Sequence, residues 1–154
     1  MIKIIILILL LPLFSIGQET QIKQPWEIGC DTIMTQKKMN ICSYQSYKIA
    51  DSILTSNYRS LISYLDSRYI EAEHNVESPT DTIQLDYLKL LRNQIQSIKA
   101  SQKDFYKFLE STTDIIHFQY EGGSMRPLVV NKYALDLTVK QIETMNNLSD
   151  DIKR

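Results

Sequence analysis

Residues 81–118 read DTIQLDYLKLLRNQIQSIKASQKDFYKFLESTTDIIHF, and this stretch decides the fold. It contains no glycine and no proline, and its apolar residues recur at alternating steps of three and four. That period is typical of a long helix with one buried face, as in the seam of a coiled coil. The predicted seam has two polar members and consists of Leu88, Leu91, Ile95, Ile98, Gln102, Phe105, Leu109, Thr112 and Ile116.

A second helix is predicted ahead of this stretch, from about Thr35 to Tyr69, with Thr35 as its N-cap. Its apolar stripe has the same spacing. The polar residues 71–80, which include His74 and Pro79, are expected to form the loop between the two helices. The stripe consists of Tyr47, Ala50, Leu54, Tyr58, Leu61 and Leu65, widened by Ile49, Ile53 and Ile62.

A third helix is expected to begin near Pro127, because proline suits the first helical position. Its stripe is weaker and consists of Leu128, Leu135, Thr138, Ile142, Met145 and Leu148. Helices of about 35 residues would be about 50 Å long, and none of them could bury its stripe alone. The sequence therefore predicts an all-α fold, an antiparallel three-helix bundle with two long helices and a shorter C-terminal helix.

The first 17 residues have the layout of a cleavable signal peptide. Lys3 precedes an apolar run from Ile4 to Phe14, and the small residues Ser15 and Gly17 follow. The run is shorter than the roughly 20 residues that span a bilayer, and no lipobox cysteine follows it. We therefore expect no stable membrane anchor after cleavage, and a mature single domain, residues 18–154, that is periplasmic or secreted.

Charge and composition exclude several function classes. Removing Lys3 leaves 16 basic and 18 acidic residues, a net charge of −2, which argues against nucleic acid as a partner. Neither His74 nor His117 has a metal-ligand neighbour at a recognisable spacing. The carboxylates of residues such as Asp51, Asp104 and Glu110 are interpreted as solvated helix faces. The sequence thus predicts a binding protein, not an enzyme, with no metal and no cofactor.

Two cysteines, Cys30 and Cys42, remain in the mature chain. Export would permit a disulfide between them. If the whole interval were helical, their Cα atoms would stand about 18 Å apart, which is too far for a bridge. A bridge therefore requires the chain before Thr35 to fold back along the first turns of the helix. Two free thiols are the alternative.

Residues 120–126, YEGGSMR, are the most distinctive local feature. Gly122 and Gly123 allow backbone angles that are closed to other residues, so the chain can reverse tightly there. One interpretation is a turn that only connects two helices. The other is a protruding binding loop that presents Tyr120, Ser124 and Arg126 to a partner.

Several short motifs follow one another in a fixed order. They are Cys30, Thr35-Gln36, Met39-Asn40, Cys42, Ala50-Asp51, Leu54, Tyr58, Ser101-Gln102, Phe105, Gly122-Gly123-Ser124 and Thr138. Their order and spacing resemble the LprI-type lysozyme-inhibitor domain over roughly residues 30–148. The resemblance implies an exported helical domain, and some members of that family inhibit lysozyme.

The chain also departs from the pattern of that family. Two further cysteines common in the family are replaced by Thr113 and Tyr133, which lie at equal distances on either side of Gly123. Their joint absence implies that they pair with each other in relatives, which leaves Cys30 and Cys42 as partners here. A family arginine appears as Leu109 and a family glutamate as Lys38, so any activity that depends on those groups is not transferred.

Two functions remain in competition. The first is inhibition of a lysozyme-like glycoside hydrolase, in which Ser124 and Arg126 would bind the pair of catalytic carboxyl groups that such enzymes use. The second is a general envelope interaction or structural module with no lysozyme target. The modest net charge does not favour steering toward a basic enzyme, which keeps the second function open.

Overall fold

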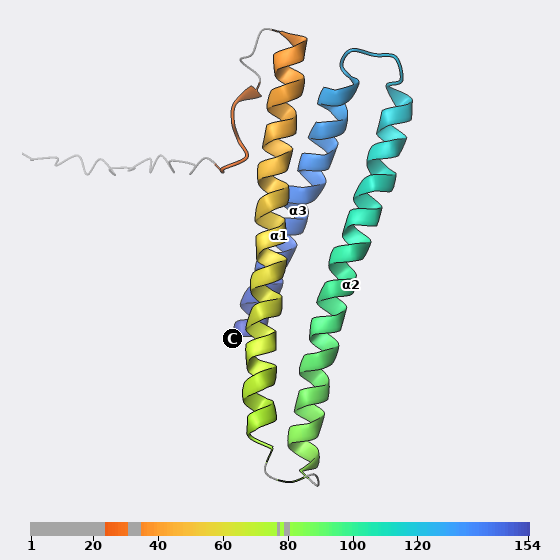
Figure 1. The fold of residues 1–154 in the computed structure, drawn as a ribbon. Helices are drawn as coiled ribbons and strands as arrows, with labels where there is room; N and C mark the ends of the chain where they lie inside the picture. Colours follow the sequence, from red (N-terminus) through yellow and green to blue (C-terminus); the bar gives the residue numbers. More distant parts are fainter. Residues whose placement is uncertain (1–23, 31–34, 77, 79–80) are drawn as a thin grey trace, which may run out of the picture.

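The computed structural model describes residues 24–30, 35–76, 78 and 81–154. They form three α-helices, α1 (Gln36–His74), α2 (Thr82–Gln119) and α3 (Arg126–Lys153). Successive helices run antiparallel, so that α3 returns alongside α1 (Figure 1). The predicted all-α three-helix bundle, with two long helices and a shorter third, is confirmed. The predicted signal peptide, residues 1–17, lies outside the described residues.

The predicted stripes form the core. Every member of the α2 seam is buried or half-buried, and Ala50, Leu54, Tyr58, Leu61 and Leu65 of α1 are at most 1% exposed. The predicted stripe residues of α3 are buried or half-buried, except Leu148, which is 39% exposed. Beyond Met145 the inward row continues at steps of four and three through Ser149 and Ile152, which are half-buried.

The helix ends differ slightly from the prediction. The first helix does not end near Tyr69 but continues to His74, and Ala72 in this added part is only 4% exposed. Residues 71–74 are helix formers apart from His74, and their contact with the core through Ala72 extends the helix. Thr35 is the N-cap residue of α1 with an extended backbone, but among the described residues its side chain makes no capping hydrogen bond. The third helix begins at Arg126, one residue before Pro127.

The third helix is shorter than its neighbours, with 28 residues against 39 and 38. Near its end, Lys153 Nζ lies 5.6 Å from the centre of the Tyr64 ring of α1. Beyond that point α1 and α2 continue as a pair (Figure 1). Arg68 of α1 links this pair, because it donates to the hydroxyl of Tyr87 in α2 (2.7 Å) as well as to that of Tyr64 in its own helix (2.9 Å).

Cys30 and Cys42 form a disulfide, with 5.7 Å between their Cα atoms, which confirms the predicted bridge. A bridged sulfur carries no hydrogen, so the buried Ser46 hydroxyl donates to Cys30 Sγ at 3.8 Å. The bridge holds residues 24–30 against the bundle, where Trp26 packs on the core. Within the described part of the chain, no helix is both long and apolar enough to cross a membrane.

Candidate functional site

The tip of the molecule, residues 120–126, joins α2 to α3 at the end of the bundle where α1 begins (Figure 1). Gly122 has a φ of +77°, a conformation that favours glycine. Gly123 is tightly placed for a different reason, since a Cβ there would lie 3.3 Å from the Tyr120 carbonyl oxygen, closer than most Cβ contacts. The Gly123 amide donates to that same oxygen at 3.1 Å, so the chain turns closely on itself.

A polar cluster around Asn40 holds the tip against α1. Asn40 Nδ2 donates to the Ser124 carbonyl oxygen (3.3 Å), and Gln36 Nε2 donates to Asn40 Oδ1 (2.8 Å). From α3, Asn131 Nδ2 donates to the Ser43 hydroxyl (3.0 Å) and to the Asn40 carbonyl oxygen (3.3 Å). Asn40 therefore fixes the tip to α1 through the Ser124 backbone, and Asn131 joins the first turns of α3 to the same part of α1.

The two polar side chains predicted for this site, Ser124 and Arg126, can each bind a partner. Ser124 is exposed and Arg126 is half-buried at the first position of α3. Among the described residues, neither the Ser124 hydroxyl nor the Arg126 guanidinium has a hydrogen-bond or ion-pair partner. The first turn of α3 contains no acidic residue, and Met125 at its N-cap provides no side-chain cap. Arg126 therefore places a positive charge at the positive end of a helix without compensation, which is unfavourable in the isolated protein.

Tyr120 is the third side chain predicted for this site, and it is 40% exposed. Its backbone amide caps α2 by donating to the Ile116 carbonyl oxygen at 3.2 Å. The structure thus brings Tyr120, Gly122, Gly123, Ser124 and Arg126 together in one short segment, as their sequence positions require. It adds Met125, which is 51% exposed and was not among the residues predicted for this site.

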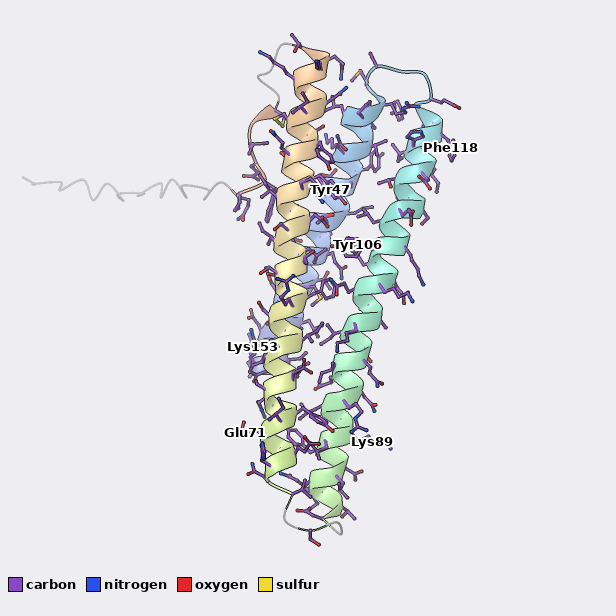
Figure 2. All side chains as sticks on the ribbon, viewed as in Figure 1. Tyr47, Glu71, Lys89, Tyr106, Phe118 and Lys153 are labelled. Carbon is purple, nitrogen blue, oxygen red and sulfur yellow. A yellow bond between two sulfur atoms is a disulfide. The ribbon has the colours of Figure 1, made fainter. Side chains whose placement is uncertain are left out.

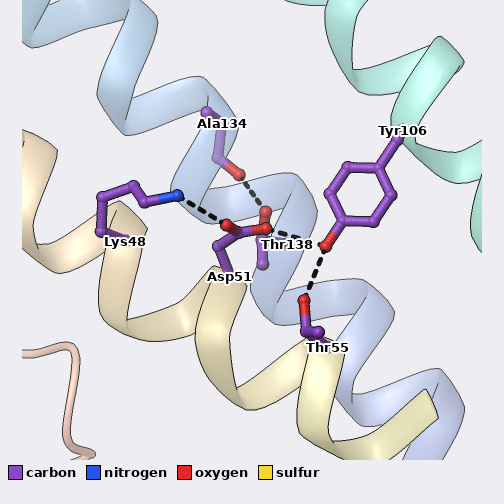
Figure 3. Close-up of polar contacts among 6 residues, drawn as sticks. All are labelled: Lys48, Asp51, Thr55, Tyr106, Ala134 and Thr138. Carbon is purple, nitrogen blue, oxygen red and sulfur yellow. Dashed lines mark hydrogen bonds and ion pairs between the residues drawn. The ribbon is translucent and has the colours of Figure 1, made fainter. Parts of the chain in front are cut away.

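A second polar cluster lies between α1 and α2, halfway along the bundle (Figure 3). The Tyr106 hydroxyl donates to Asp51 Oδ1 at 2.8 Å and lies 3.1 Å from the Thr55 hydroxyl. Lys48 Nζ pairs with the other Asp51 oxygen at 2.9 Å. The interpretation of Asp51 as a solvated helix face was wrong: its side chain is only 17% exposed, because Tyr106 reaches across from α2 to bind it.

The electrostatics of this cluster are those of a structural link. Burial, and then the hydrogen bond to Asp51, raise the pKa of Tyr106 to about 12, although the bond to Thr55 opposes the shift. Burial and the nearby Asp51 also raise the pKa of Tyr47. Both hydroxyls therefore stay protonated at neutral pH, and Tyr106 acts as a hydrogen-bond donor that joins two helices.

The histidines are far apart in the fold. His74 is the last residue of α1 and not a loop residue as predicted, and His117 lies in the last turn of α2. The His117 ring packs edge-on against Phe118, with 5.9 Å between ring centres. Over the described residues, no group of three histidine, cysteine or carboxylate side chains is placed to hold a metal ion.

Comparison with known proteins places these features in a family. The model of the family described as "Lysozyme inhibitor LprI" matches residues 29–145. An uncharacterized protein of Rhizobium meliloti (strain 1021) is 24% identical over 128 residues, which cover 83% of this chain and 83% of the relative. No solved structure matches this chain. The match spans the disulfide, the tip and all three helices up to Met145.

Proposed function

Because the chain belongs to the LprI lysozyme-inhibitor family, we propose that its exported form binds a lysozyme-like muramidase and occludes the catalytic cleft with the tip. The family description names inhibition and not a catalysed reaction. Muramidases of this kind work with two carboxyl groups that flank the scissile bond. The proposal requires the tip to present groups that bind such a pair.

Arg126 carries this proposal. Its guanidinium is a planar donor that matches a carboxylate, and it has no partner of its own among the described residues. The neighbouring Ser124 hydroxyl can donate a further hydrogen bond. A carboxylate bound here would also compensate the positive end of α3, which Arg126 leaves without a counter-charge. The same contact would therefore satisfy two unfavourable features of the free protein.

A lysozyme turbidity assay with the mature, oxidised protein tests the proposal. The parent protein should slow the clearing of a cell-wall suspension by egg-white lysozyme. The double variant Ser124→Ala, Arg126→Ala should lose inhibition or weaken it about tenfold or more, because truncating a charged group buried in an interface typically costs 2 kcal/mol or more. Its melting temperature should not fall, since the variant removes a cation from a positive helix end.

The control is the double variant Ser67→Ala, Arg154→Ala, which removes the same two side-chain types from exposed positions outside the tip. It should inhibit like the parent. If the parent inhibits and the tip variant inhibits equally well, the contact surface lies elsewhere. If the parent inhibits no muramidase at all, a general envelope interaction or structural module becomes the function to pursue.

A further inference from the structure

The last third of α2, which leads to the tip, exposes three large apolar side chains. Phe108 is 54% exposed, Ile115 is 67% exposed and Phe118 is 70% exposed. Their spacing of seven and three residues places them in one row along the helix, which we call the apolar ridge. Figure 2 shows Phe118 on the side of α2 that is turned away from α1, so the bundle itself does not cover this end of the ridge.

Acidic side chains flank the ridge. Glu110 and Asp114 precede Phe118 by eight and four residues, so they lie on the same side of the helix as Phe118 and border the ridge there. Glu121 follows at the tip. All three are exposed, and within the described residues none of them belongs to an ion pair. Residues 108–121 contain these three acidic residues and no lysine or arginine, so this segment is more acidic than the net charge of −2 for the mature chain indicates.

The ridge and its acidic flank together indicate which kind of partner would bind there. Exposed aromatic and aliphatic side chains rimmed by polar groups are typical of protein interaction surfaces. An acidic rim complements a partner surface that is rich in lysine and arginine. The ridge is also continuous with the tip, since Tyr120 follows Phe118 within two residues. One partner could therefore contact both.

We propose that the apolar ridge is the main anchor for the target enzyme, and that the target is a basic muramidase whose cationic surface around the cleft faces Glu110, Asp114 and Glu121. The inference rests on the proposed function and extends it. Arg126 then orients the tip toward the catalytic carboxyl groups, whereas Ile115 and Phe118 supply most of the buried apolar area. The acidic flank accelerates association with enzymes of high positive charge.

Two pairs of variants test this inference, with binding to immobilised egg-white lysozyme, a basic muramidase, followed by surface plasmon resonance. Ile115→Ser, Phe118→Ser should weaken binding about tenfold or more, mainly through faster dissociation. The matched control Ile83→Ser, Leu90→Ser removes two exposed apolar residues from the opposite end of the same helix and should bind like the parent. Equal folding of all variants is checked by thermal melting.

The second pair addresses charge. Glu110→Lys, Asp114→Lys should slow association about fivefold or more at low ionic strength, and the difference should vanish in about 0.5 M salt. Asp86→Lys, near the start of α2, is the control and should associate nearly as fast as the parent. Because each change lies on the surface, the helix should be retained.

The outcomes separate the two proposals. If the parent binds and inhibits but the ridge variant matches the parent, or the Ile83 and Leu90 control weakens binding equally, the ridge is not the anchor and the proposed function still stands. If the charge variant associates as fast as the parent, the preference for a basic enzyme is wrong. If the parent neither binds nor inhibits, the proposed function fails and this inference fails with it.

Discussion

The Tyr106 hydroxyl of α2 donates a hydrogen bond to Asp51 of α1 and so links the two helices. Burial keeps this hydroxyl protonated by raising its pKa. The pKa of Tyr106 is raised to about 12, above the value of about 10 expected in the unfolded chain. Below about pH 10 the phenol is protonated in both states, and its full contribution to stability is present. As pH rises toward 12 the unfolded state loses the proton first, so this contribution is lost.

Tyr106→Phe should therefore lower the free energy of unfolding at neutral pH by about 1–2 kcal/mol, because Asp51 loses a hydrogen-bond donor in a site that is only 17% exposed. Urea denaturation followed by circular dichroism measures the change. Tyr44→Phe, at a ring that is 52% exposed, is the control and should change stability by less than about 0.5 kcal/mol.

The same variant checks the pH dependence. Between about pH 10 and 12 the parent should lose more stability than Tyr106→Phe, which lacks the titrating group. A variant that is as stable as the parent at pH 7, and loses stability just as steeply in alkali, would show that the link between Asp51 and Tyr106 does not contribute.

Contacts between residues far apart in the chain could not be predicted from the sequence. The tip was found from its glycines, because Gly122 and Gly123 are a local signal. Asn40 was not assigned a role, since its partner Ser124 is 84 residues away and no local pattern connects them. Asp51 was misinterpreted for the same reason, because Tyr106 lies 55 residues later in the chain. Contacts between helices depend on how the stripes align, which periodicity alone does not specify.

At the scale of elements, the spacing of apolar residues was sufficient to predict α2. Residues 81–118 contain no helix breaker and repeat their apolar positions throughout, so α2 was predicted to within one residue at each end. The predicted end of α1 near Tyr69 was wrong by five residues, because residues 71–74 are polar on average and only Ala72 marks the buried face. The chain before α1 has no period at all, and only its cysteine indicated that it is fixed to the bundle.

The Cys30–Cys42 bridge should hold this N-terminal segment in place. Trp26, the one tryptophan of the chain, packs against the core and lines a surface groove with Leu135 and Val139 of α3. The double variant Cys30→Ser, Cys42→Ser should lower the free energy of unfolding by about 3 kcal/mol, as expected for a short closed loop. Its tryptophan emission should shift to longer wavelength as Trp26 becomes solvated.

Circular dichroism provides the control: residues 24–30 lie outside the three helices, so the helical signal at low temperature should be retained. Reduction of the parent protein should reproduce both effects. Unchanged emission together with an unchanged unfolding midpoint would show that the segment stays in place without the bridge.

At the scale of the whole molecule, the unequal helix lengths divide the bundle into two parts. The end that carries the tip has three helices and the Asn40 cluster. The far end, beyond the contact between Lys153 and Tyr64, consists of α1 and α2 alone. Two helices bury less apolar surface than three, so polar links have to supply more of the local stability there. The binding surface proposed above is thus at the end that the bundle holds most firmly.

This difference predicts the pattern of amide hydrogen exchange. Residues 66–74 of α1 and 82–92 of α2 should exchange faster than residues 42–58, which contact α2 through Asp51 and α3 through Tyr58. Arg92→Gln should accelerate exchange at the far end only, because it removes a donor that lies 2.6 Å from the Tyr69 hydroxyl and a cation 5.5 Å from the centre of that ring. Lys89→Gln is the control, since Lys89 lies on the outer side of α2 (Figure 2). Uniform exchange along α1, or equal acceleration by both variants, would mean that the bundle opens as one unit and that its two ends are equally stable.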